Sequence, residues 1–140
     1  MPEEQTLTMN GQTMDFQQGE TILEVAERHG VFIPTLCHIK GLSASAACRI
    51  CVVEEERSGD LLTSCHAPPR KGMVLHTDSK KVISSRKTTL ELLLASGNHD
   101  CLLCPASGEC TLQDLAYLYQ VPGNKFSRQV PPYDMETVNP

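Results

Sequence analysis

The chain has 140 residues, of which 4% are aromatic and none is tryptophan, so it can bury one modest core and a small satellite. Its formal net charge is −5, and basic residues occur in pairs such as Lys80-Lys81 and Arg86-Lys87 instead of forming a stripe, which argues against a nucleic-acid partner. No amino-terminal stretch joins a basic region to a long apolar run, and no apolar segment is long enough to span a membrane. We therefore expect a cytoplasmic protein without direct membrane insertion.

A two-stranded ribbon is expected near the amino terminus. Residues 6–9 and 13–16 alternate apolar and polar side chains around Asn10-Gly11. This dipeptide favours a type I′ turn because both central positions need a positive φ. Residues 21–24 then match a capping box, which predicts a short amphipathic helix that ends near Gly30.

The next segment combines an irregular loop with further strands. Residues 36–47 are rich in Gly, Ser and Ala and have no apolar period, which is typical of a loop whose backbone approaches a compact group. Strands are expected at 52–54 and 73–76, with a turn at 58–60 after the first of them. The ribbon, helix and strands predict a small α+β domain over residues 1–79.

The pattern changes to helix from about residue 79, where apolar residues crowd a segment that ends at Gly97. Thr111 can cap a second helix. These helices predict a small helical domain over residues 80–122. Residues 123–140 hold several prolines without periodic apolar residues, so we expect an extended tail or linker there.

Seven cysteines form two groups with distinct spacings. In a reducing compartment such a pattern is more typical of metal binding or catalysis than of disulfides, and an odd number of cysteines cannot pair completely. The first group, C-x10-C-x2-C-x13-C, comprises Cys37, Cys48, Cys51 and Cys65, and the second, C-x2-C-x5-C, comprises Cys101, Cys104 and Cys110.

The first group has the donor set of a [2Fe–2S] cluster. Such a cluster needs four thiolates, and a long loop with isolated cysteines followed by C-x2-C can wrap it while backbone N–H groups point at the sulfides. Arg49 adds positive charge between the paired cysteines. Zinc is the alternative, because one C-x2-C is also a zinc half-site. Zinc ribbons, however, pair two such units at about 15–20 residues, whereas 49 residues separate Cys51 from Cys101.

The second group supplies three thiolates, one fewer than a [4Fe–4S] cluster needs. His99 is the nearest candidate for a fourth ligand, because a neutral imidazole can bind iron and leaves the cluster less negative than four thiolates do. Asp100, water or a partner residue remain open. His38 and His66 follow cysteines directly, and we interpret them as surface residues or neighbours of a ligand. A catalytic dithiol at Cys101 and Cys104 would need a surrounding βαβ pattern that the sequence lacks.

Several motifs together resemble the amino-terminal iron–sulfur region shared by the large iron–sulfur subunit of complex I, iron-only hydrogenases and NAD-dependent formate dehydrogenases. The resemblance implies a β-grasp [2Fe–2S] ferredoxin-like domain followed by a small helical domain, whose [4Fe–4S] cluster is bound by one histidine and three cysteines. It extends from residue 6 to about residue 121. The motifs are Leu36-Cys37-His38, residues 47–54, Thr63-Ser64-Cys65, Gly72-Met73-Val74, residues 100–104 and residues 108–116.

The chain departs from this family in two respects. The family's histidine usually stands four residues before the first cysteine of the second group, a position that Gly97 occupies here, whereas His99 is two before it. Relatives also continue into further cluster-binding and catalytic domains, so the chain is either a stand-alone subunit or a fragment of a longer protein. The resemblance therefore implies both cofactors but no catalytic chemistry.

The expected function is a relay of single electrons within a larger hetero-oligomeric oxidoreductase. The expected neighbours are a flavin-bearing, NAD(P)H-oxidising iron–sulfur subunit and a catalytic subunit. We expect no catalytic site in the chain itself. A zinc-stabilised docking module without redox activity and a thiol redox enzyme are the alternatives.

Overall fold

The computed structural model describes residues 5–97, 99–121 and 126. The chain divides into two compact units, residues 1–86 and 87–140, and the division falls inside helix α2. The expected domain boundary near residue 80 stays a prediction, and the expected tail at 123–140 lies outside the described residues apart from Phe126. The elements in chain order are β1 (Thr6–Met9), β2 (Gln12–Asp15), α1 (Ile22–Arg28), β3 (Val52–Glu55), β4 (Leu61–Thr63), β5 (Val74–His76), α2 (Lys80–Ala95) and α3 (Thr111–Leu118).

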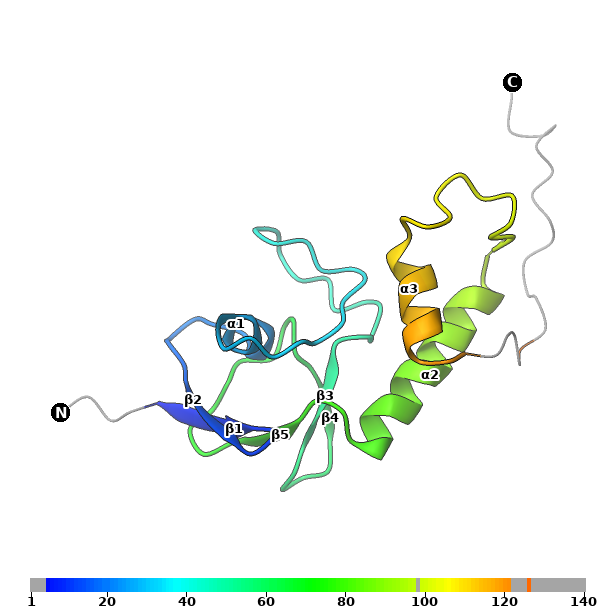
Figure 1. Cartoon of the computed structure of the whole chain (residues 1–140). Coiled ribbons are helices and arrows are strands. Elements are labelled where there is room, and N and C mark those ends of the chain that lie inside the picture. Colours follow the sequence, from blue (N-terminus) through cyan, green and yellow to red (C-terminus); the bar gives the residue numbers. More distant parts are fainter. Residues whose placement is uncertain (1–4, 98, 122–125, 127–140) are drawn as a thin grey trace. The chain divides into compact units, whose positions relative to one another are not determined.

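The first unit is built on a mixed sheet in the order β2-β1-β5-β3-β4. β1 and β5 pair in parallel, and the other neighbouring strands pair antiparallel. Helix α1 lies over one face of this sheet (Figure 1). This arrangement confirms the α+β fold class that the sequence predicts.

The amino-terminal hairpin forms as expected. Asn10 and Gly11 have φ values of 50° and 81°, and Met9 pairs with Gln12, so the turn contains two residues. The second strand starts one residue earlier than predicted. The side chain of Asn10 also accepts a hydrogen bond from the backbone N–H of Thr77 at 2.9 Å and donates one to the Thr77 hydroxyl at 2.7 Å. The turn is therefore tied to the segment that follows β5.

Helix α1 begins with the predicted capping box. The Thr21 hydroxyl accepts from the Glu24 backbone N–H, and the Glu24 carboxylate accepts from the Thr21 backbone N–H. Its buried face packs against the sheet residues, and the resulting core also includes Cys51 and Cys65. Other core residues are Leu7, Met9, Met14, Ile22, Leu23, Val25, Ala26, Ile33, Val53, Met73 and Leu75.

Strand β4 is the one strand of the sheet that the sequence prediction missed. Its three residues, 61–63, are all half-buried at the edge of the sheet, so they show no alternation of apolar and polar side chains. A turn precedes it as expected, but at residues 56–58 and not at 58–60; the Gly59 N–H donates to the Glu55 carbonyl at 2.8 Å. Strand β3 extends one residue further than predicted, and β5 starts one residue later.

The start of helix α2 is tied to the sheet. The Ser79 hydroxyl accepts from the Val82 N–H at 3.3 Å, as an N-cap residue does, and donates to the Glu54 carboxylate. The Lys81 ammonium donates to the Gly59 carbonyl. These contacts all lie in the first unit, and they tie the first turn of the helix to the sheet.

The prediction that Thr111 caps the second helix of this region is wrong by one residue. Cys110 is the N-cap of α3, and its side chain makes no capping hydrogen bond. A cysteine at this position leaves its thiol available for another partner. In the part of the chain that the structure describes, no helix has both the length and the apolar character needed to cross a membrane.

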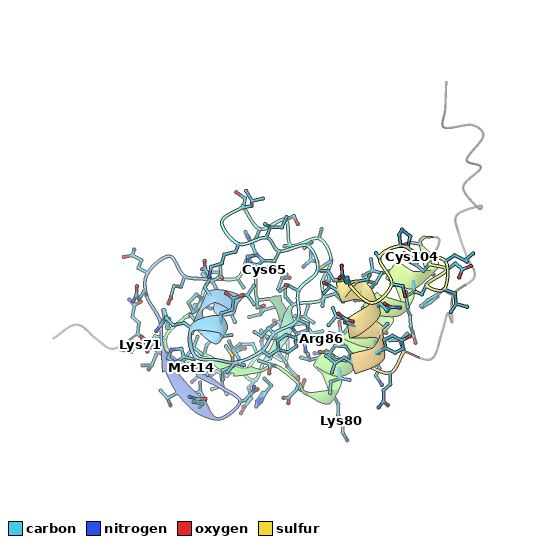
Figure 2. All side chains as sticks on the ribbon, turned by 45° about the horizontal axis from the view of Figure 1, so that its top comes forward. Met14, Cys65, Lys71, Lys80, Arg86 and Cys104 are labelled. Atoms are coloured by element: carbon cyan, nitrogen blue, oxygen red, sulfur yellow. The ribbon has the colours of Figure 1, made fainter. Side chains whose placement is uncertain are left out.

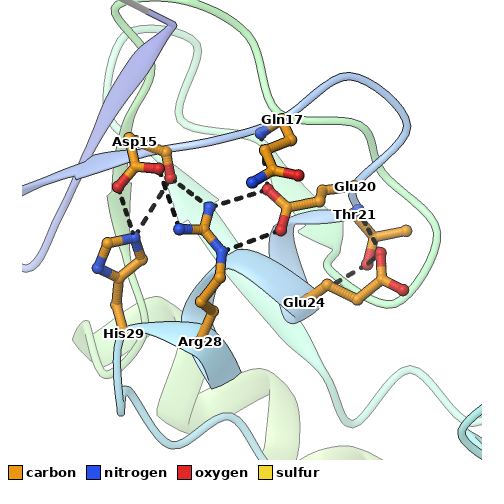
Figure 3. Close-up of polar contacts among 7 residues, drawn as sticks. All are labelled: Asp15, Gln17, Glu20, Thr21, Glu24, Arg28 and His29. Atoms are coloured by element: carbon orange, nitrogen blue, oxygen red, sulfur yellow. Dashed lines mark hydrogen bonds and ion pairs between the residues drawn. The ribbon is translucent and has the colours of Figure 1, made fainter.

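An exposed ion-pair network joins the end of α1 to the hairpin (Figure 3). The Arg28 guanidinium lies 3.0 Å from carboxylate oxygens of both Asp15 and Glu20, and it also donates to the Asp15 carbonyl. The hydrogen bonds from Arg28 lower the pKa of Asp15 and of Glu20 below their ordinary values of 3.8 and 4.5.

We expect Arg28→Gln to lower the denaturant midpoint at neutral pH, by an amount that shrinks as salt is added. Because Arg28 lowers both pKa values, its stabilising effect is present above the ordinary values of 3.8 and 4.5 and is lost as the carboxylates become protonated. Unfolding titrations of the variant and of an exposed control, Arg70→Gln, test this. If the variant's denaturant midpoint were lowered by the same amount at strongly acid pH, the ion pairs would not be the cause of the loss of stability.

Candidate metal centres

The four cysteines of the first group gather in the first unit. Cys37 and Cys48 belong to the loop between α1 and β3, Cys51 directly precedes β3, and Cys65 follows β4. The Cys48 backbone N–H donates to the Cys37 sulfur at 3.5 Å. Cys51 contacts Cys65, and all three other thiols contribute to the raised pKa of Cys65. None of the seven cysteines forms a disulfide.

The electrostatics of this group favour a bound cation. Burial and then the neighbouring cysteines raise the pKa of Cys65 to about 12, because a second negative charge beside the first is unfavourable. Cys37 shows the opposite shift: hydrogen bonds from the Ser45 side chain and the Cys48 N–H lower its pKa to about 7. Thiolates this close together are stabilised when metal ions neutralise them, which fits the donor set of a [2Fe–2S] cluster.

Two side chains to which the sequence analysis assigned no role hold the backbone around Cys51. The buried Ser64 hydroxyl donates to the Cys51 carbonyl at 2.6 Å, and the Ser64 N–H donates to the same oxygen at 3.2 Å. The guanidinium of Arg86, on α2 (Figure 2), donates to the carbonyls of Ile50 and Val52. Neither contact has a local sequence signal, because the partners are far apart in the chain.

The loop that carries the first three cysteines contains two left-handed residues that are not glycine. Ala46 has φ 51° and Arg49 has φ 60°, a conformation that is unfavourable for residues with a Cβ. The Arg49 side chain donates to the Thr63 hydroxyl at 2.8 Å. Such strain persists only where surrounding contacts determine the backbone, and it is found most often at functional sites.

The second group lines a cavity of about 60 Å³ within the second unit. His99 and all three cysteines of the group line it, so the structure brings together the four residues that the sequence singled out. Both views show α3 beside the second half of α2, with the cysteine loop joining them (Figures 1 and 2). The full lining is Leu94, His99, Cys101, Cys104, Ser107, Cys110, Leu112 and Gln113.

The absence of a side chain at Gly97 makes room for the His99 ring. A Cβ atom at position 97 would lie 2.7 Å from His99 Nε2, closer than real contacts allow. The same nitrogen lies 3.1 Å from the Leu93 carbonyl oxygen. The imidazole thus occupies space that a side chain at position 97 would otherwise take.

Gln113 holds the loop that leads to Cys110. Its side-chain oxygen accepts from the Gly108 N–H at 2.9 Å, and its amide nitrogen donates to the Ser107 hydroxyl at 3.3 Å. Sequence reasoning treated Gln113 only as part of a motif. Among residues 5–97, 99–121 and 126, no three potential ligands are arranged to hold a single metal ion. The assignment of these cysteines to iron–sulfur clusters therefore depends on the chemistry of the thiols and on the cavity that the second group shares.

Comparison with known protein families decides between the metals that these donors could bind. The model of the 2Fe-2S iron-sulfur cluster binding domain matches residues 3–80, which is more than half of the chain. The chain belongs to this family. A second model, the NADH-ubiquinone oxidoreductase-G iron-sulfur binding region, matches residues 86–124. The cofactors are therefore a [2Fe–2S] cluster and a [4Fe–4S] cluster, as the sequence predicts.

Similar proteins are subunits of nicotinamide-dependent oxidoreductases. NADP-reducing hydrogenase subunit HndD of Solidesulfovibrio fructosivorans is 42% identical, over 92% of this chain and 22% of the relative. The mitochondrial NADH-ubiquinone oxidoreductase 78 kDa subunit of Candida albicans is 36% identical, over 89% of this chain and 17% of the relative. A chain in the crystal structure of an NAD⁺-reducing [NiFe]-hydrogenase superposes with a TM-score of 0.85 at 36% identity, covering 92% of this chain and 54% of that one.

In the reduced, metal-free protein we expect iodoacetamide to modify Cys37 with a half-maximal rate near pH 7, since its thiolate forms there. Cys65, whose pKa is about 12, should stay unreactive. Ser45→Ala should move the Cys37 profile toward the ordinary pKa of 9.0, and the neighbouring Ser43→Ala should not. Mass spectrometry of pulse-labelled protein measures both. Equal reactivity of Cys37 and Cys65 at pH 7 would show that their pKa values are not shifted in opposite directions.

Proposed function

We propose that the chain relays single electrons between a flavin-bearing, NAD(P)H-oxidising subunit and a catalytic subunit of a larger cytoplasmic hetero-oligomeric oxidoreductase. The observation that carries this proposal is the presence of two ligand sets in one chain, each inside its own compact unit. The two matched family regions occur in the same order. A single site would suit storage or sensing, whereas two sites in one chain suit a relay.

The first set would hold the [2Fe–2S] cluster through Cys37, Cys48, Cys51 and Cys65. Cys51 and Cys65 are only 1% and 2% exposed and belong to the core, while Cys37 and Cys48 lie in the loop. When bound, each cluster accepts and releases one electron. The chain's own contribution is to keep water away from one side of the cluster and to hold its ligands still, so that little rearrangement accompanies each transfer.

The second set would hold the [4Fe–4S] cluster through Cys101, Cys104, Cys110 and His99. Two observations support His99 as the fourth ligand: it lines the same cavity as the three thiols, and its ring lies against Gly97. In the family that the chain resembles, the histidine usually stands at this position. In this chain His99, two residues after that position, would supply the imidazole that binds the cluster.

The neighbours are inferred from the relatives and from the surface of the second site. The similar proteins include NADP-reducing, NADH-ubiquinone and NAD⁺-reducing enzymes, which favours a nicotinamide-oxidising partner at one end of the relay. Leu102 and Leu103, between two proposed ligands, are 96% and 83% exposed. Apolar side chains this exposed beside a redox centre favour a docked protein partner.

The first experiment is iron and acid-labile sulfide analysis with electron paramagnetic resonance of the anaerobically purified protein during stepwise reduction. We expect about six iron and six sulfide per chain and two distinct signals, from one cluster of each type. Zinc without sulfide would support the docking-module alternative, and a free low-pKa thiol in the loaded protein would support the thiol enzyme.

Ligand variants assign each signal to its group. Cys48→Ser should weaken or abolish only the signal of the first centre, because oxygen replaces one of its four thiolates. Cys104→Ser should do the same only to the second. The two variants serve as controls for each other, since each keeps the other centre intact. Loss of both signals in either variant would contradict two independent sites.

The role of His99 is tested through Gly97. Because a Cβ at position 97 would meet the far end of the His99 side chain, we expect Gly97→Ala to displace the ring at little cost to the fold. It should therefore alter the spectrum and potential of the second centre only, as should His99→Ala. Thr88→Ala, an exposed change on α2 in the same unit and outside the cavity lining, is the control. His99→Cys should keep the cluster and lower its potential, since a fourth thiolate adds negative charge.

Potentiometric titration followed by electron paramagnetic resonance measures these changes. An unchanged second centre in His99→Ala would show that His99 is not the fourth ligand, whatever the effect of Gly97→Ala.

A further inference from the structure

Arg86 is a buried cation beside the backbone that carries a proposed ligand of the first cluster. Its side chain is 2% exposed, although an arginine is rarely buried to this extent. Nε donates to the Ile50 carbonyl at 3.0 Å, and Nη2 donates to the Val52 carbonyl at 2.8 Å. These two carbonyls belong to the residues immediately before and after Cys51.

Together with Ser64, Arg86 holds three consecutive carbonyl groups. The Cys51 carbonyl, between the two that Arg86 binds, accepts from the Ser64 hydroxyl at 2.6 Å. A planar guanidinium can serve two separated acceptors with a fixed geometry, whereas a lysine ammonium is a point charge on a flexible stem. The contacts therefore fix the peptide units on both sides of the Cys51 side chain.

An arginine guanidinium carries a fixed positive charge in proteins. Burying a charge is unfavourable unless nearby groups compensate it, and in a low-dielectric interior its effect on other charges is stronger than in water. A [2Fe–2S] cluster bound by four thiolates is anionic and gains one more negative charge on reduction. A fixed positive charge close to its ligand backbone stabilises the reduced form more than the oxidised form.

We propose that Arg86 is a positioning residue that holds the Cys51 backbone and raises the reduction potential of the [2Fe–2S] centre. The inference rests on the proposed ligation by Cys51. It gives a role to a residue that the sequence presents only as half of a scattered basic pair, Arg86-Lys87. The first half of α2, which is tied to the sheet through Ser79, positions the Arg86 side chain beside residues 50–52.

Potentiometric titrations of the first centre in the full-length protein test this proposal. Arg86→Gln removes the charge, Arg86→Lys keeps it, and Arg70→Gln removes the charge of an exposed arginine in the same unit. We expect Arg86→Gln to reduce the equilibrium constant for reduction at least about tenfold, a potential lower by about 59 mV for a one-electron couple. Arg86→Lys should recover most of this shift, and Arg70→Gln should show little change.

The other possible results also distinguish between a role of Arg86 at the cluster and a role in the fold alone. An unchanged potential in Arg86→Gln, or an equal shift in Arg70→Gln, would overturn the proposal. If Arg86→Gln holds no cluster but Arg86→Lys holds one at the wild-type potential, the positive charge is what the site requires, which supports it. If neither variant holds a cluster, Arg86 serves the fold alone and the proposal fails. Absence of sulfide from the wild-type protein would instead refute the proposed function.

Discussion

The constraint on which the first centre depends is the fixed backbone at residues 50–52. The loop before it has no regular structure and includes the left-handed Arg49, so local preference does not hold it in place. Hydrogen bonds from Ser64 and Arg86 do so instead, and both donors are buried. The Ser64 carbonyl in turn accepts from the Leu23 N–H at 3.0 Å, which connects α1 to the same group. The candidate cluster site is therefore part of the core.

The features that could be predicted from the sequence are those with a local physical cause. The Asn10-Gly11 turn follows from backbone sterics, and the Thr21 cap follows from a hydrogen bond three residues along the chain. The cysteine groups were recognisable because ligand spacing is itself a local signal. Strand β4 was not, because it is short and half-buried, and its pairing with β3 is what makes it a strand.

Residues that act across the fold could not be predicted in the same way. Arg86 lies 34 positions from Val52 in the sequence, and no pattern marks it as buried. The N-cap of α3 is Cys110 and not Thr111; its thiol makes no capping hydrogen bond and lines the cavity, which no capping pattern in the sequence indicates. The role of Gly97 depends on where the His99 ring folds back, which is a property of the three-dimensional loop.

The side chain of Asn10 has a consequence for engineering. In an isolated hairpin, replacing asparagine by glycine at the first position of a type I′ turn keeps a suitable backbone. Here the same amide binds Thr77 through both its oxygen and its nitrogen, two residues before Ser79, which caps α2. A sequence optimised for the turn alone would therefore loosen the anchorage of a distant helix, so a redesign of this hairpin has to treat turn and helix as one unit.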